Sequence, residues 1–280
     1  MSLPSYVDSL RSSASLANNR GVTIDGIPLH GGTRAEALSH CLHLIRSGSG
    51  GRVATANLDF FAIARRDAQL RMDLEQSSLV TIDGAPIAWL ARLCGAASAQ
   101  RYAGVDLVAD LCSSATATQP LRAAILGSTP DVAGPATRSL TAVAPHVEFV
   151  FVEHPPFRPL TEDEVTSYKA RLSDARPHVV FVALGCPRQE RLIAEWSDSV
   201  VGALWIGIGG TLDFFAGKKR RAPGWAQQAG LEWVVRMGQD PRRLARRYLL
   251  RDIPALVAIA PGVVRSRFTR MKQLSNQSAP

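Results

Sequence analysis

Residues 179–196 read VVFVALGCPRQERLIAEW, and this stretch defines one structural unit of the chain. The run from Val179 to Leu184 is apolar without a polar face, as expected of a strand that is buried on both sides. Pro187 suits the first position of a helix, and the segment from Pro187 to Trp196 is amphipathic. A strand that leads through a short loop into a helix is the repeating unit of a parallel α/β sheet.

The same alternation extends over most of the chain. Apolar runs typical of strands occur at Val22 to Leu29, Arg52 to Ala56, Leu79 to Ile82, Leu121 to Leu126, Val147 to Val152, Val179 to Leu184 and Ala203 to Ile208. Helical patterns lie between them, at Thr33 to Ser47, Leu58 to Gln76, Pro86 to Cys94, Asp106 to Thr116, Pro130 to Val143, Thr161 to Arg176 and Pro187 to Trp196. Thr161, with Glu164 three residues later, forms a capping-box signature. The pattern predicts an α/β fold with a mostly parallel, Rossmann-like sheet flanked by helices.

Composition favours an enzyme of a reducing compartment. The chain has 280 residues, of which 46% are hydrophobic, so it is long enough to bury a sizeable core. Its four cysteines form no CxxC pair and no metal-ligand spacing, which is typical of free thiols. Residues 1–20 are rich in Ser, Ala and Asn and lack a continuous apolar region, so we expect a disordered segment, no signal peptide and a cytoplasmic protein.

Positive charge is concentrated near the C-terminus. Between residues 217 and 251 there are ten Lys or Arg against two acidic residues, whereas the whole chain carries a net charge of +8. Such a segment fits an anionic partner, and nucleic acid, an acidic membrane surface and the diphosphate of a substrate are the candidates. The plainer alternative is a solvated basic face. Nucleic acid is not favoured, because the segment has neither interleaved aromatic residues nor a zinc pattern.

An apolar run follows the basic segment. It extends from Ile253 to Val264 and is too short to cross a bilayer, which requires about 20 apolar residues. A basic helix followed by a short apolar helix suits a segment that lies in the membrane interface. We therefore expect four regions: a disordered segment at 1–20, an α/β core at 21–216, a basic helical membrane-proximal appendage at 217–270, and a flexible tail at 271–280.

Polar or glycine-rich residues follow four of the expected strands. The carboxyl ends of parallel strands share one edge of a sheet, where ligands bind. Each of these residues also has a structural alternative: Thr55, Asn57 and Asp83 are common helix caps or turn residues, and Glu190 suits the first turn of a helix. In chain order, the residues at the ends of these four strands are Thr55 and Asn57, Asp83-Gly84, Gly185 with Gln189-Glu190, and Gly209-Gly210 with Asp213.

Together with later motifs, these residues resemble the WecG/TagA/CpsF family of bacterial glycosyltransferases (glycosyltransferase family 26). The resemblance covers roughly residues 22–251. The matching motifs, in chain order, are Thr55-x-Asn57, Val-Thr-Ile-Asp83-Gly84, Arg101-x-x-Gly104-x-Asp106, Leu-Gly185-x-Pro187-x-Gln189-Glu190, Gly207-x-Gly209-Gly210-x-x-Asp213-Phe214, Arg220-Arg221-Ala222-Pro223 and Gly230-Leu-Glu232-Trp233-x-x-Arg236.

The resemblance implies an inverting transferase that moves a sugar from a UDP donor to a polyprenyl-diphosphate-linked acceptor at the cytoplasmic face of the inner membrane. N-acetylmannosamine, its uronic acid and glucose are the sugars implied, in exopolysaccharide, capsule or other cell-surface biosynthesis. By matching position, Asp83 is the general base, Thr55 and Asn57 line the sugar pocket, and Gln189 and Asp213 hold the nucleotide. Gly185, Pro187, Glu190, Gly209 and Gly210 belong to the same donor-binding loops, and Arg236, Arg243 and Arg246 supply positive charge from the appendage.

The residues themselves agree with a reaction that needs no metal or other cofactor. No two aspartates stand two positions apart, so the Asp-x-Asp metal motif of many nucleotide-sugar transferases is absent from the sequence. Arginines grip phosphate oxygens bidentately and are expected to stabilise the departing diphosphate instead. Arg101 is the nearest cation for an acidic sugar, with an ion pair to Asp106 as its alternative role.

Two other functional classes are considered. They are a nucleotide-binding protein that acts on nucleic acid and a non-catalytic scaffold of a polysaccharide assembly complex. The sequence does not decide whether the protein forms a homo-oligomer.

Overall fold

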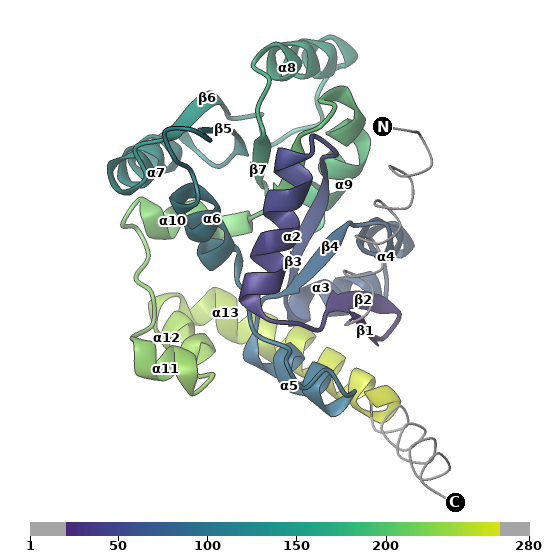
Figure 1. Ribbon diagram of the computed structural model, residues 1–280. Helices are drawn as coiled ribbons and strands as arrows, with labels where there is room; N and C mark the ends of the chain where they lie inside the picture. Colours follow the sequence, from purple (N-terminus) through teal and green to yellow (C-terminus); the bar gives the residue numbers. More distant parts are fainter. Residues whose placement is uncertain (1–20, 264–280) are drawn as a thin grey trace, which may run out of the picture.

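The computed structural model describes residues 21–263, except for the side chains of Gln227, Gln228 and Arg243. Its centre is a six-stranded parallel sheet with the strand order β4-β3-β8-β7-β5-β6 (Figure 1). The expected α/β fold with a parallel, helix-flanked sheet is therefore confirmed. The strands are β3 (Gly51–Ala56), β4 (Leu79–Ile82), β5 (Leu121–Gly127), β6 (Val147–Glu153), β7 (Val179–Ala183) and β8 (Leu204–Gly207).

The strands are apolar on both faces because helices cover both faces. Every residue of β7 is buried, and its side chains alternate between two cores. Val179 and Phe181 join the core on one face, whereas Val180 and Val182 join the core on the other. The first face is covered by α2 (Arg34–Arg46), α6 (Gly104–Ser113), α7 (Pro130–Val143) and the short α10 (Leu212–Phe215). The second face is covered by α3 (Leu58–Ala64), α4 (Ala68–Glu75), α8 (Glu162–Asp174) and α9 (Arg188–Trp196).

For two of the predicted elements, the predicted residue range is wrong. The single strand expected at 22–29 is an antiparallel hairpin of β1 (Gly21–Ile24) and β2 (Ile27–His30). Asp25 and Gly26, both with positive φ, form its two-residue turn, which is a common hairpin dipeptide.

The long helix expected at 58–76 is likewise divided into α3 and α4. Asp67 interrupts it, because its side chain accepts a hydrogen bond from the backbone of Leu70 and thereby caps a new helix. The capping box at Thr161 and Glu164 is confirmed at the start of α8.

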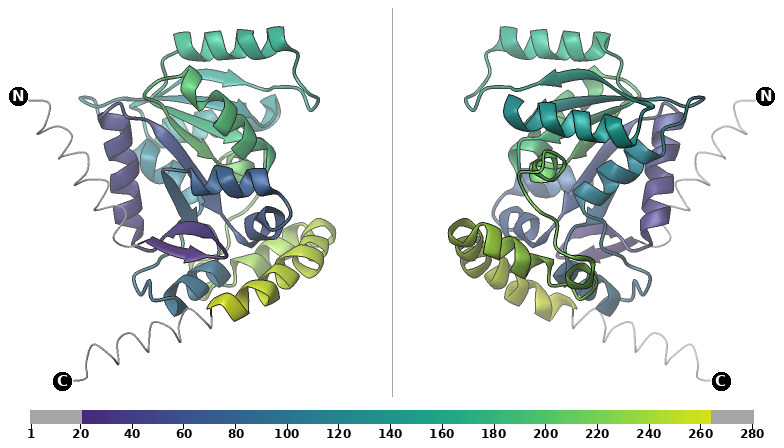
Figure 2. Two further views of the ribbon diagram at one scale, coloured as in Figure 1. Left: turned by 90° about the vertical axis from the view of Figure 1, so that its right-hand side faces the viewer. Right: turned by 90° about the vertical axis from the view of Figure 1, so that its left-hand side faces the viewer.

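The appendage runs beside α5 (Ala85–Leu93) and α3, below the sheet in Figure 1 and in both views of Figure 2. Its elements are α11 (Gly224–Gln228), α12 (Glu232–Gln239), α13 (Pro241–Arg247), η3 (Tyr248–Asp252) and a helical continuation over 253–263. Ile259 and Val263 of that continuation are buried against the core that contains α5. None of the helices within 21–263 has both the length and the apolar character required to span a bilayer. The expected disordered segment at 1–20, the last residues of the appendage and the tail at 271–280 lie outside the described residues.

Candidate active site

A cleft of about 1250 Å³ opens where the strands end. Its floor consists of residues that follow β3, β4, β7 and β8, and its roof consists of residues from α12, α13 and η3 of the appendage. This is the edge at which open parallel sheets bind their ligands. The fold thus brings the residues at the ends of the strands and the residues of the appendage together in one site, although the two sets are far apart in the sequence.

Most of the residues expected in the site line this cleft. They are Thr55, Asn57, Asp83, Gly185, Gln189, Gly209, Gly210, Arg236 and Arg246. The structure places Arg101, Pro187, Glu190 and Asp213 near the cleft but not in its lining. The side chain of Arg243 lies outside what the structure describes.

Asp83 stands directly after β4, and its backbone N–H donates to the carbonyl of Ala56. It is not a helix cap, because the N-cap of α5 is Gly84 and no side chain caps that helix. Within residues 21–263 its carboxylate has no hydrogen-bond or ion-pair partner. Burial raises the pKa of this carboxyl group, and the opposing effect of Arg236 and Arg101 is smaller. A carboxylate with a raised pKa that faces a cleft is suited to accept a proton from a ligand.

Thr55 and Asn57 have structural roles beside Asp83. The buried hydroxyl of Thr55 donates a 2.9 Å hydrogen bond to the carbonyl of Gly207, which ties β3 to β8. The Asn57 side-chain oxygen accepts from the backbone of Asp59 at 3.0 Å and caps α3. The capping role therefore applies to Asn57, while both side chains still border the cleft.

Gln189 connects the two glycine exits, defined as Gly185 after β7 and Gly209-Gly210 after β8. Its side-chain oxygen accepts hydrogen bonds from the backbone N–H of Gly185 at 3.1 Å and of Gly209 at 2.9 Å. Glu190 lies behind it, 5% exposed, and burial raises the pKa of that carboxyl group to about 7. Glu190 is thus turned away from the cleft and supports the loops that form its floor.

Four cations lie around the second glycine exit. Lys218, Lys219, Arg220 and Arg236 all line the cleft. Lys219 is paired with Asp213, and the Arg236 guanidinium lies over the ring of Phe214, 5.3 Å from its centroid. Backbone that is free of side chains, with cations beside it, suits a phosphate-bearing ligand.

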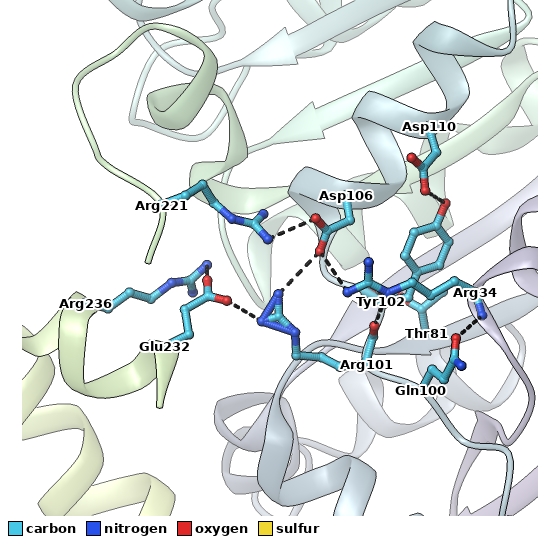
Figure 3. Close-up of polar contacts among 10 residues, drawn as sticks. All are labelled: Arg34, Thr81, Gln100, Arg101, Tyr102, Asp106, Asp110, Arg221, Glu232 and Arg236. Atoms are coloured by element: carbon cyan, nitrogen blue, oxygen red, sulfur yellow. Dashed lines mark hydrogen bonds and ion pairs between the residues drawn. The ribbon is translucent and has the colours of Figure 1, made fainter. Parts of the chain in front are cut away.

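An ion-pair network joins the appendage to the body of the protein (Figure 3). Glu232 of α12 is buried and pairs with Arg101 of the body and, at 3.0 Å, with Arg236 of its own helix. Asp106 of α6 pairs with Arg101 at 3.3 Å and with Arg221 at 2.9 Å. Arg101 is therefore engaged by two carboxylates, and its role in the structure is to hold α12 in place.

Comparison with known proteins identifies the family. The family model described as "Glycosyl transferase WecG/TagA/CpsF family" matches residues 22–273. The chain belongs to this family.

Curated relatives agree with the family match. A protein of Bacillus subtilis (strain 168) is 28% identical over 204 residues, which cover 73% of this chain and 77% of the relative. A protein of Staphylococcus aureus (strain MW2) is 27% identical over 202 residues, which cover 72% and 76%. Both are named N-acetylglucosaminyldiphosphoundecaprenol N-acetyl-beta-D-mannosaminyltransferase.

In this WecG/TagA/CpsF-family protein, several charged residues in or beside the cleft were not assigned a role from the sequence. Glu232 and Arg221 belong to family motifs, yet only the fold reveals that they are partners of Arg101 and Asp106. Arg66 also lines the cleft, from the link between α3 and α4. A family motif marks Glu232 and Arg221, and charge alone marks Arg66, but neither signal specifies a partner more than 100 positions away.

Proposed function

We propose that the chain transfers a sugar, with inversion, from a UDP donor to a sugar carried on a polyprenyl diphosphate. The names of the relatives describe transfer to a diphosphoundecaprenol-linked sugar with a β-linkage in the product. The observation that carries the proposal is the carboxylate of Asp83, which has no hydrogen-bond partner within residues 21–263 and faces a cleft whose other wall is cationic.

The reaction assigns a separate task to each part of the cleft. Asp83 accepts the proton of the acceptor hydroxyl as its oxygen bonds to the anomeric carbon of the donor. The bond from that carbon to the diphosphate oxygen breaks, and its electron pair leaves with UDP. Such proton transfer contributes roughly 10²- to 10⁴-fold to a rate. Arg236 and Lys219 stabilise the charge that develops on the leaving diphosphate.

We propose that these cations serve in place of a divalent metal. Guanidinium groups present paired donors that match phosphate oxygens. The glycine exit at Gly209-Gly210 allows the backbone to approach the same phosphates. Transfer should accordingly proceed at an unchanged rate in excess EDTA, and loss of activity that Mg²⁺ restores would contradict this part of the proposal.

We propose a neutral sugar as the group transferred. Arg101, the cation expected for an acidic sugar, is held by Glu232 and Asp106 and does not line the cleft. UDP-N-acetylmannosamine is the first donor to test, because both relatives named above are N-acetylmannosaminyltransferases. UDP-glucose and the uronic acid of N-acetylmannosamine are the comparison donors, and a thermal-shift screen ranks all of them by the stabilisation each provides.

We further propose that the enzyme works as a peripheral protein on the acidic inner face of the membrane. Large apolar side chains are exposed on α5 and along the appendage. They are Trp89, Leu93, Trp225, Trp233, Leu249, Leu250, Ile253 and Val257. An exposed apolar surface beside a basic helix is typical of proteins that lie in a membrane interface.

The decisive experiment is a transfer assay with the purified full-length protein, UDP-N-acetylmannosamine and a short-chain prenyl-diphosphate N-acetylglucosamine. The wild type should form a β-linked disaccharide, and Asp83→Asn should lose about 100-fold or more in rate while retaining its affinity for UDP. Near-normal turnover by Asp83→Asn would remove that residue from the role of base. Absence of transfer with every donor would favour a scaffold, and salt-dependent binding to duplex DNA would favour a nucleic-acid-directed protein.

A further inference from the structure

Five of the cations that line the cleft fall into two groups on opposite faces of the sheet, whereas Arg236, Arg246 and Arg247 belong to α12 and α13 of the roof. The first group, Lys218, Lys219 and Arg220, follows α10, which packs against α7 on the first face. The second group, Arg66 and Arg251, lies by α3, which packs against α4 on the second face. A cleft of about 1250 Å³ exceeds the roughly 300–1000 Å³ of a typical single-ligand pocket, so it has room for two substrates.

The chemistry of inversion places the two substrates on opposite sides of the reacting carbon. The donor diphosphate suits the first group, because the glycine exit at Gly209-Gly210 lies beside Lys219. The acceptor must approach from the side away from that leaving group, which is the side of α3 and the second group. An acceptor that carries its own diphosphate needs cations there as well.

The second group is arranged to receive an anion. Arg66 lines the cleft with an exposed side chain, and within residues 21–263 it has no ion-pair partner. One terminal nitrogen of Arg251, Nη2, lies 2.8 and 2.9 Å from the two carboxylate oxygens of Asp59. Asp59 thus fixes the position of the guanidinium, and within residues 21–263 its Nη1 and Nε make no hydrogen bond and can donate to a ligand.

Exposed apolar side chains flank Arg251 in the chain. Leu249 and Leu250, just before Arg251 in the chain, are 63% and 64% exposed, and Leu250 also lines the cleft. Ile253, two residues after Arg251, is about half exposed. A diphosphate at Arg66 and Arg251 would therefore have an apolar path beside it for the attached hydrocarbon chain.

We propose that Arg66 and Arg251 form the binding subsite for the diphosphate of the lipid-linked acceptor, with Asp59 as the residue that positions Arg251. This inference rests on the proposed function and adds to it the place where the acceptor binds. In this arrangement, the donor diphosphate binds on the first face of the sheet and the acceptor diphosphate binds on the second face.

The test is a comparison of Arg66→Gln and Arg251→Gln with Arg65→Gln as the matched control. Arg65 is the neighbouring arginine, partly exposed, and it pairs with Asp25 of the β1–β2 turn instead of lining the cleft. With a short-chain acceptor in solution and no vesicles, each subsite variant should raise the KM for acceptor by about tenfold or more. The affinity for UDP, measured by calorimetry, should stay within about twofold of wild type, and Arg65→Gln should match wild type in both measurements.

A second acceptor separates the diphosphate from other contacts. The wild type should prefer the diphosphate-linked acceptor over its monophosphate analogue, and Arg66→Gln should lose most of this preference. An unchanged acceptor KM in both variants, or an equal loss of UDP affinity, would overturn the subsite. Variants that lose only their binding to anionic phospholipid vesicles would show that the two arginines contact lipid head groups instead. If the wild type transfers sugar to neither acceptor, the proposed function fails, whereas a subsite failure alone leaves wild-type transfer intact.

Discussion

The side-chain nitrogen of Gln189 donates a 2.7 Å hydrogen bond to the buried carboxylate of Glu190. This contact fixes which end of the Gln189 amide points toward the glycine exits, because only the oxygen can accept from the backbone N–H groups of Gly185 and Gly209. Glu190 thus orients the side-chain amide of Gln189, and this amide connects the loops that contain Gly185 and Gly209.

Gln189→Leu should weaken donor binding, because leucine has a similar size but accepts no hydrogen bond. Two backbone N–H groups would lose their partner, and we expect the affinity for UDP to fall by about tenfold or more. Calorimetric titration with UDP measures the effect. Gln69→Leu is the control, since Gln69 bonds Asp73 on α4, outside the cleft lining. Equal UDP affinities in wild type and Gln189→Leu would contradict the proposed role of this residue in shaping the donor site.

Glu190 should make the protein less stable as pH rises. Burial raises its folded-state pKa from 4.5 to about 7, so the unfolded chain releases this proton at a lower pH than the folded protein does. The free energy of unfolding contributed by this group therefore falls between about pH 4.5 and pH 7. Urea unfolding at pH 5 and pH 8 should show Glu190→Gln gaining about 2 kcal/mol relative to wild type between the two conditions. Parallel pH profiles for the two proteins would contradict the assignment.

The rate of transfer should depend on the ionisation of Asp83. The base must be deprotonated, so kcat/KM should fall as pH decreases through the raised pKa of this carboxyl group. Arg236→Gln removes a neighbouring positive charge and should move this acid limb to higher pH, in addition to lowering the rate. A pH–rate profile for each protein measures the shift. A limb in Arg236→Gln that stays at its wild-type position would show that Asp83 is not the titrating group.

Glu232→Gln should loosen the contact between the appendage and the body. The buried carboxylate is shared by Arg101 and Arg236, and removing its charge leaves both arginines without that partner. We expect trypsin to cut within residues 217–263 about tenfold faster than in wild type, because local opening of the appendage exposes the arginines of this segment to the protease. Glu195→Gln, at an exposed position on α9, is the control.

A double-mutant cycle with Arg101→Gln tests whether the effect passes through this ion pair. The two substitutions should be less than additive in the rate of cleavage, since each alone breaks the same contact. Wild-type cleavage rates in Glu232→Gln would show that other contacts hold the appendage.

The sequence predicted the sheet because its signal is repeated and local. Each buried strand is a continuous apolar run followed by an amphipathic helix, as in 179–196, and the exits of parallel strands must share one edge. The hairpin at Asp25-Gly26 and the break at Asp67 escaped prediction because single turn and cap residues contradict an otherwise regular pattern.

The sequence predicted a residue of the candidate site where that residue ends a strand. It did not predict a role that depends on a partner far away in the sequence. Asp83, Gln189 and the glycines fall in or beside the cleft because strand topology places them there. The engagement of Arg101 by Glu232 joins residues 131 positions apart, and no periodicity encodes such a pair. That Arg66 and Arg251 line the same cleft depends in the same way on how the appendage packs against α3.

The appendage is fastened on both sides of the cleft, by Glu232 to Arg101 at one end and by Arg251 to Asp59 at the other. An appendage held at both ends would have to break one of these ion pairs before it could swing away from the cleft as a hinged lid. If the two diphosphates bind on opposite faces of the sheet as proposed, UDP would leave from the side of α10 and the lengthened lipid from the side of α3. Neither product would have to wait for the other, so turnover should show no compulsory order of release.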